Sequence, residues 1–113
     1  MPPTSRTELA HDMFAAFAAG DRARIESLLA PSLRFHAPPD PDLDRAGYFE
    51  RCWPGSGSGG TFDFARIIEA GDAVVVTYNA TRNGGSRFRN TEVLTFDGDR
   101  VVEIEVYFGW NLA

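Results

Sequence analysis

The stretch TEVLTFDGDRVVEIEVYFGW, residues 91–110, contains two segments in which apolar and polar side chains alternate, separated by the turn-forming sequence DGDR. In the second segment Glu103 and Glu105 fall on one side of an extended chain, and the other side is apolar: Val102, Ile104, Val106, Phe108 and Trp110. A period of two predicts β-strands, and the short turn makes them antiparallel neighbours. The two glutamates are either a catalytic acid–base pair or the solvent-facing side of an ordinary strand.

Two more strands are predicted upstream of this pair. The segments TFDFARIIEAG, residues 61–71, and AVVVTYNATR, residues 73–82, alternate in the same way. The sequence NGGS, residues 83–86, is typical of a hairpin turn and leads into RFRNTEVLTF, residues 87–96. We therefore expect consecutive antiparallel strands to fill the C-terminal half of the chain.

The N-terminal half predicts helices. Apolar residues spaced three and four apart indicate an amphipathic helix that follows Thr4 or Ser5, with a glutamate three residues after Ser5 completing a capping box. This helix is expected to end at Gly20. Asp21 then caps a second, shorter helix, which Pro31 stops.

The segments between these helices and the sheet are shorter. LRFHAP, residues 33–38, predicts a short isolated strand, and PPDPD, residues 38–42, predicts a rigid turn. Residues 43–53 predict a third helix, and PGSGSGG, residues 54–60, predicts a flexible loop. These elements together predict a single α+β domain over residues 1–113, with a strongly curved sheet wrapped around the helices.

Composition and charge exclude several classes of function. A net charge of −5 and a pI near 4.9 argue against binding of nucleic acid, which requires a basic surface. Cys52 is the single cysteine, so neither an intrachain disulfide nor a cysteine-based zinc site is expected. We find no signal peptide and no apolar run of the ~20 residues that a membrane span requires. A soluble, cytoplasmic protein with no membrane partner is therefore expected.

The order of elements resembles the nuclear transport factor 2-like superfamily, and within it the SnoaL-like, or polyketide cyclase-like, group. The segments that carry the resemblance are AAGD at 18–21, LLAPSLRFHAP at 28–38 and the long strands that end at Trp110. The resemblance implies a cone-shaped α+β barrel, in which three N-terminal helices pack on a curved, mainly antiparallel sheet around a deep apolar pocket. It also implies a homodimer, which would cover the second face of the long apolar strands. Members include ketosteroid isomerases, polyketide cyclases and epoxide hydrolases, as well as proteins that only bind ligands.

The positions that the resemblance marks as catalytic are apolar in this chain. Alignment on AGD and on the proline after the first strand places Ala37 where a ketosteroid isomerase has its base, and Met13 where it has a tyrosine. Ketosteroid isomerases depend on acid–base groups with tuned pKa values, and neither substituted side chain transfers a proton. The late aspartate of the cyclases and epoxide hydrolases aligns near Val106, and the Arg-x-Asp spacing of the hydrolases is absent from the predicted strands.

A different polar set provides the candidate catalytic residues. Glu92 and Asn90 share a side of their strand with apolar residues, so Glu92 is expected to be a carboxylate in an apolar wall with a raised pKa. The alternative is a solvated Glu92, or one paired with Arg89. Tyr78 extends from an apolar strand face and is a candidate hydrogen-bond donor, and a half-buried tyrosine at the end of the sheet is the alternative.

His36 is a candidate proton carrier at the end of the first strand, although strict alternation turns it away from Phe35 and Ala37. If the facing of the strands is reversed, Asn79 replaces Tyr78. The histidines and acids show no metal-ligand spacing, and no cofactor is expected. Neither a phosphate-binding glycine motif nor a nucleophile elbow occurs.

The expected ligand is a small hydrophobic molecule. Its pocket is predicted to be lined by the following side chains: Met13, Phe17, Phe35, Tyr48, Phe49, Trp53, Phe62, Val76, Val106 and Phe108. Residues 55–60 would form a flap. Two functions stay open: proton transfer of the isomerase, cyclase or dehydratase type by Glu92, with Tyr78 or Asn90 holding an oxyanion, or a binding or dimerisation module without catalysis.

Overall fold

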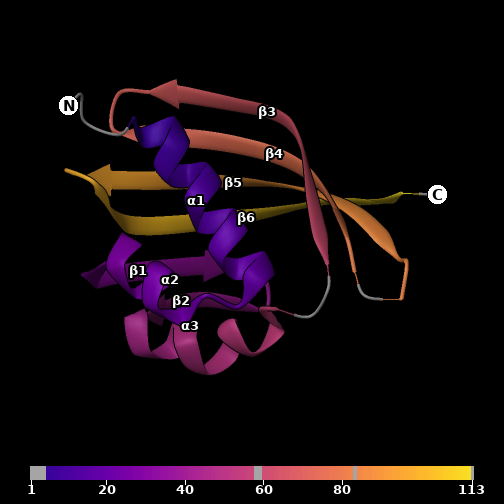
Figure 1. Ribbon diagram of the computed structural model, residues 1–113, viewed down its shortest axis with the longest axis horizontal. Coiled ribbons are helices and arrows are strands. Elements are labelled where there is room, and N and C mark those ends of the chain that lie inside the picture. Colours follow the sequence, from indigo (N-terminus) through magenta and orange to yellow (C-terminus); the bar gives the residue numbers. More distant parts are fainter. Residues whose placement is uncertain (1–4, 58–59, 83, 113) are drawn as a thin grey trace.

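The computed structural model describes residues 5–57, 60–82 and 84–112, and in these ranges the helices pack on one face of a six-stranded sheet (Figure 1). The elements in chain order are α1 (Arg6–Ala19), α2 (Arg22–Leu28), β1 (Leu29–Ala37), β2 (Asp40–Asp44), α3 (Arg45–Arg51), a 3₁₀ turn (Trp53–Gly55), β3 (Thr61–Ala70), β4 (Ala73–Thr81), β5 (Arg87–Asp97) and β6 (Arg100–Leu112). No helix within these ranges is long and apolar enough to cross a membrane.

The first two helices begin and end as their sequences predict. The Ser5 hydroxyl accepts a hydrogen bond from the backbone N–H of Glu8 at 3.1 Å, which caps α1. Gly20 ends the helix in the left-handed conformation, with φ 71°, which a residue without a Cβ adopts at no steric cost. The Asp21 carboxylate then caps α2 by accepting from the backbone N–H of Arg24 at 3.1 Å.

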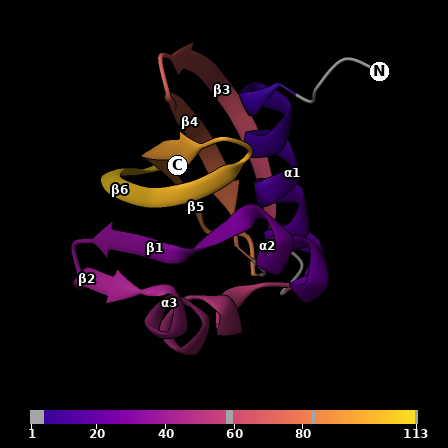
Figure 2. The same cartoon turned by 90° about the vertical axis from the view of Figure 1, so that its left-hand side faces the viewer.

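The sheet has the strand order β2-β1-β6-β5-β4-β3, in which β1 and β6 are parallel and the other neighbours are antiparallel. Figure 2 shows that β3 and β4 run in a clearly different direction from β1 and β2, so the sheet curls around α1 and α2. The prediction that the first strand is isolated was wrong, because β1 lies between β2 and β6. Strand β6 therefore joins the two ends of the chain into one sheet.

The structure corrects the predictions for residues 38–53. Only residues 38 and 39 form a turn, and the rest of the predicted turn belongs to the edge strand β2, in which Leu43 pairs with Phe35. Pro41 is tolerated there because an edge strand does not need every backbone N–H for pairing. Helix α3 is shorter than predicted, because the Asp44 carboxylate caps it by accepting from the N–H of Gly47 at 2.8 Å. The chain leaves α2 before Pro31, which lies inside β1.

The core lies between α1 and the inner face of the sheet. In β4 the residues Val74, Val76, Tyr78 and Ala80 alternate inward, and each is less than a tenth exposed. In β5 the corresponding inward positions include Asn90 and Leu94. This arrangement determines which face of β4 and β5 points to the interior, and it is the face that carries Tyr78 and Glu92.

Candidate acid–base site in an apolar cavity

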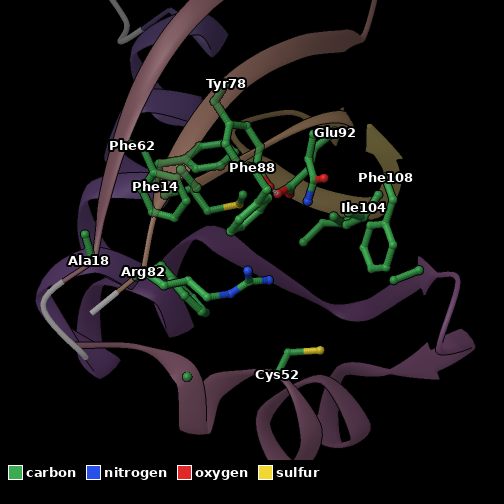
Figure 3. A pocket seen from close by; sticks show the side chains of 18 of the residues that line it. Phe14, Ala18, Cys52, Phe62, Tyr78, Arg82, Phe88, Glu92, Ile104 and Phe108 are labelled. Carbon is green, nitrogen blue, oxygen red and sulfur yellow. Dashed lines mark hydrogen bonds between the residues drawn. The ribbon is translucent and has the colours of Figure 1, made fainter. Parts of the chain in front are cut away.

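A cavity of about 710 Å³ lies between the helical layer and the inner face of β4, β5 and β6 (Figure 3). Volumes of roughly 300–1,000 Å³ are typical of small-molecule sites. The structure places in its wall these members of the predicted lining: Met13, Phe17, Phe35, Tyr48, Phe62, Val106 and Phe108. Most of the wall is apolar, so a polar group inside it acts in a poorly solvated environment.

Three aromatic rings form one side of this wall. Phe14 lies edge-to-face against both Phe62 and Tyr78, with ring centroids 5.1 Å apart in each pair. Phe62 and Tyr78 are themselves edge-to-face at 5.3 Å. Such packing fixes ring orientation and contributes roughly 0.5–1.5 kcal/mol per pair beyond area burial. The ring of Tyr78 is therefore held in place by Phe14 and Phe62, and this packing fixes the position of its hydroxyl in the cavity wall.

Glu92 projects from β5 into the cavity, opposite Val76 on β4 and Val106 on β6. The Tyr78 hydroxyl donates a hydrogen bond to Glu92 Oε2 at 2.6 Å. Burial raises the pKa of the Glu92 carboxyl from 4.5 to about 7, and the hydrogen bond from Tyr78 opposes that rise. Near neutral pH the carboxyl therefore exists in both its acid and its base form.

The predicted alternative in which Glu92 pairs with Arg89 does not fit this geometry. The Arg89 side chain points to the outer face, where its Nε donates to Asn79 Oδ1 at 2.7 Å and its guanidinium lies 5.7 Å from the Trp110 ring. Asn79 is thereby excluded from the cavity, and Tyr78 takes the inward position.

The charge of Glu92 acts on the hydroxyl groups of two tyrosines, Tyr78 and Tyr48. Burial raises the pKa of Tyr78, and so do the charge of Glu92 and the hydrogen bond to it. Burial and the Glu92 charge likewise raise the pKa of Tyr48, which lies on α3 and is 5% exposed. Both phenols are therefore protonated at neutral pH, and within the described residues the Tyr48 hydroxyl has no hydrogen-bond partner. It is a second donor available to a ligand.

Asn90 lies beside this group in β5 and is 8% exposed. Its Oδ1 accepts from the backbone N–H of Gly109 at 3.3 Å across an irregularity in the β5–β6 pairing. A Cβ on Gly109 would lie 2.3 Å from the carbonyl oxygen of Arg89, so only glycine permits this close approach. The bond to Gly109 fixes the orientation of the Asn90 amide. Hydrogen bonding from Asn90 lowers the pKa of Tyr78 and so offsets part of its rise.

His36 does not line the cavity, so the prediction that it carries a proton there is corrected. Its Nε2 lies 2.9 Å from Glu103 Oε2 and its Nδ1 lies 2.7 Å from the Pro41 carbonyl oxygen. Both contacts raise the pKa of His36, and the hydrogen bond to the Pro41 carbonyl is the larger cause. The alternation of β1 turns His36 to the outer face. Glu103 faces outward with it, and Glu105 on the same strand accepts from the Tyr107 hydroxyl at 2.6 Å.

Three residues of the predicted lining lie elsewhere. Val76 is fully buried on the correct face but is covered by the core. Phe49 points to a recess on the other side of α3, with the Arg22 guanidinium stacked on its ring at 3.8 Å. Trp53 packs edge-to-face on Phe17 behind the wall, with ring centroids 5.7 Å apart.

The cavity also contains polar groups that sequence analysis missed. Arg82, Cys52 and the ion pair between Arg51 and Asp40 line it. Phe14 was missed as well, although its spacing from Met13 and Phe17 on one helix face indicates it. Cys52 is indicated too, because it follows Tyr48 by four residues and falls on the same side of the predicted third helix. No pattern in the sequence indicates Arg82, Arg51 or Asp40, which reach the cavity from a loop, the end of α3 and an edge strand.

The glycine-rich segment borders the cavity through Gly55, Gly57 and Gly60. The N–H of Gly57 donates to the Phe17 carbonyl oxygen at 2.9 Å, which holds the start of the segment against the end of α1. Residues 58–59 of the predicted flap lie outside the described residues. Over the described part of the chain, no group of three or more His, Cys, Asp or Glu side chains is arranged to hold a metal ion.

The fold and site together define a class of protein: a small α+β cone whose curved sheet and helices enclose an apolar cavity with a buried carboxyl group in its wall. The model of the SnoaL-like domain family matches residues 10–104, and the chain belongs to this family, within the nuclear transport factor 2-like superfamily. The positions that the family resemblance marked as catalytic, Met13, Ala37 and Val106, all line the cavity. The sequence has no significant match among curated proteins.

Solved structures with similar folds are numerous. A putative ketosteroid isomerase from Kribbella flavida is 19% identical with a TM-score of 0.81; the match covers 96% of this chain and 80% of the Kribbella flavida chain. A cystatin-fold protein from Novosphingobium aromaticivorans is 17% identical with a TM-score of 0.79, covering 92% and 98%. TerC, co-crystallized with polyporic acid, is 21% identical with a TM-score of 0.77, covering 93% and 92%. At these identities the similarity shows the fold alone.

Proposed function

We propose that this protein binds a small hydrophobic molecule in the cavity and that Glu92 transfers a proton within it without a cofactor, in an isomerisation, cyclisation or dehydration. The observation that carries the proposal is the Glu92 carboxyl, which lies in an apolar cavity, has a pKa raised to about 7 and accepts a hydrogen bond from Tyr78. A general base works best when its pKa is close to the working pH.

The reaction class follows from the groups present. The ionised Glu92 removes a proton from a carbon next to a carbonyl; the C–H electron pair forms a C=C bond and the π pair of the carbonyl moves to its oxygen, which gives an enolate. Glu92 is then a neutral acid, and its new O–H can donate to the Tyr78 oxygen. Tyr78 in turn becomes free to donate its own proton in a hydrogen bond to the enolate. The proton held by Glu92 returns to a different carbon in an isomerisation, or to a departing hydroxyl in a dehydration.

The comparisons support this proposal at the level of the fold. The family includes isomerases and cyclases, and one similar structure is described as a putative ketosteroid isomerase. Another similar protein was co-crystallized with polyporic acid. This chain differs in the position of its base, since Glu92 projects from β5 whereas Met13, Ala37 and Val106 occupy the positions used in the enzymes it resembles.

Exchange of a carbon-bound proton with solvent tests the proposal directly. Wild-type protein in D2O with a panel of enolisable cyclic ketones is expected to incorporate deuterium next to the carbonyl, as followed by NMR. Glu92→Gln should lower the rate roughly 10²–10⁴-fold, the usual contribution of a general base. Glu105→Gln, which changes a carboxylate on the outer face of the neighbouring strand, serves as the matched control and should leave the rate unchanged. Equal rates in wild type and Glu92→Gln would exclude Glu92 from the reaction.

A non-catalytic binding module is the second candidate, and the apolar side chains of Met13, Ala37 and Val106 favour it. In that case ligands bind in the cavity and no ketone exchanges faster than in buffer. A cytoplasmic location stays a prediction from the sequence.

We also propose a homodimer, because large apolar side chains are exposed along β6. Tyr107, Phe108 and Trp110 are each more than half exposed, and their strand lies in the middle of the sheet. Light scattering coupled to size-exclusion chromatography is expected to show twice the mass of 12.4 kDa. Trp110→Ser should shift the protein toward the monomer, and a wild-type monomer at all concentrations would refute the proposal.

A further inference from the structure

The charged side chains that line the cavity are not all balanced. Arg51 Nε donates to Asp40 Oδ1 at 2.5 Å, so these two opposite charges neutralise each other. Glu92 is bound by the Tyr78 hydroxyl. Among the described residues, Arg82 is the remaining charged lining residue, and its guanidinium has no hydrogen-bond or ion-pair partner there.

The guanidinium of Arg82 is held in position by an aromatic ring. It stacks on Phe88 at 4.1 Å from the ring centroid, and Figure 3 shows the side chain reaching into the cavity below that ring. The backbone of Arg82 is fixed by two bonds in the β4–β5 turn: its N–H donates to the Ser86 carbonyl at 2.8 Å, and its own carbonyl accepts from Gly85 at 2.9 Å. Stacking uses the face of a guanidinium and leaves its N–H edge for a ligand.

Arg82 and Glu92 belong to different parts of the cavity. Glu92 pairs with Val76 in the middle of β4, whereas Arg82 follows Thr81 at the end of that strand. A ligand can therefore be bound by a cation at one end while its reacting carbon meets a carboxylate at the other. The charged lining residues sum to one positive charge when Glu92 is protonated and to zero when it is ionised, so it is the local cation at Arg82 that attracts an anion in both states.

We infer that the cavity takes an organic monoanion: a carboxylate, or an equally acidic enol, whose oxygens accept the N–H groups of Arg82 while its aromatic or alicyclic body lies against Phe14, Phe62 and Phe88. This inference rests on the proposed function and names its substrate class. A planar carboxylate matches the fork of a guanidinium, and the single positive charge of Arg82 balances one negative charge and not the two of a phosphate dianion. The stack on Phe88 orders the guanidinium before the ligand arrives, which lowers the entropic cost of binding.

The test compares two probes of the same shape, 2-naphthoate and the neutral 2-naphthamide. Dissociation constants are measured by calorimetry with wild type, Arg82→Gln, Arg82→Lys and Arg87→Gln. Arg87 is the control, because it is an exposed arginine on the same hairpin that does not line the cavity. Thermal unfolding of each variant confirms that it is folded.

Wild type is expected to prefer naphthoate over naphthamide at least tenfold, since a hydrogen bond between charged groups contributes more than that factor. Arg82→Gln should remove the preference, Arg82→Lys should retain part of it, and Arg87→Gln should retain all of it. Equal preference in wild type and Arg82→Gln, or no binding of either probe, overturns the inference. Deuterium exchange that is insensitive to Glu92→Gln, together with Arg82-dependent binding, would refute the proposed proton transfer and leave this inference standing.

Discussion

The raised pKa of Glu92 makes folding stability depend on pH, and Glu92→Gln is the perturbation that isolates this effect. The carboxyl binds its proton more tightly in the folded protein, with a pKa of about 7, than in the unfolded chain, where 4.5 is the ordinary value. The folded state therefore holds more protons between these two values, and stability falls as pH rises through this interval. Below pH 4.5 the contribution of the protonated carboxyl is fully present, and above about pH 7 it is lost.

The magnitude follows from the same two values. A rise from 4.5 to about 7 corresponds to about 3 kcal/mol, at roughly 1.4 kcal/mol for each tenfold change in the ionisation constant. Between pH 5 and pH 8, which do not cover the full titration of the unfolded chain, about 2–3 kcal/mol of this is expected. This is a large part of the roughly 5–15 kcal/mol that a domain of this kind has in total.

Urea unfolding at pH 5 and pH 8 measures the effect. Wild type should lose about 2–3 kcal/mol more than Glu92→Gln between the two pH values, because glutamine keeps the shape and cannot ionise. Glu105→Gln controls for the removal of a carboxylate and should follow wild type. If wild type and Glu92→Gln lose the same free energy, the carboxyl is already ionised at pH 5 in the folded protein, and the argument for a general base near neutral pH fails.

Three further predictions concern the supports of the site. Tyr78→Phe removes the hydrogen bond that opposes the raised pKa of Glu92, so the pH profile of deuterium exchange should move to higher pH; an unchanged profile would contradict the bond. Gly109→Ala forces a Cβ against the Arg89 carbonyl and should destabilise the protein by about 1–3 kcal/mol in urea unfolding, whereas a neutral effect would show that the strand can shift. Ser5→Ala removes the cap of α1 and should cost about 1 kcal/mol in the same assay, with no effect on ligand binding.

Much of the fold could be predicted from local patterns. The caps at Ser5 and Asp21, the left-handed Gly20 and the alternation of the long strands are properties of a few neighbouring residues, and the structure confirms them. The side of β5 that carries Glu92 could be predicted for the same reason, because a strand has only two faces. Strand β2 could not, since Pro41 and the two prolines before the strand are typical of a turn, and Pro41 is tolerated only because β2 lies at the edge of the sheet.

The candidate site was less predictable because it depends on how distant elements meet. Tyr78 and Glu92 are on neighbouring strands, so a shared inward face is enough to bring them together. His36 was a candidate only by its place in the sequence, and its partner Glu103 is known only once β1 and β6 are seen to pair in parallel. Arg82 follows the end of a strand, and the stack on Phe88 that directs it inward has no counterpart in the sequence pattern.

The position of β6 has a consequence for synthesis of the chain. Of the described strands this one is made last, yet it lies between β1 and β5 and is the only connection between the first-made edge of the sheet and the strands β3 to β5, within the part of the chain that the structure describes. While residues 100–112 are still within the ribosome, β1 and β2 have no further strand to pair with, and the part of the cavity wall formed by Ile104, Val106 and Phe108 is missing. Pairing over such sequence separations is slow. We therefore expect the nascent protein to expose its aromatic wall until β6 has emerged and paired, and its yield in cells to depend on chaperones that bind apolar segments during that interval.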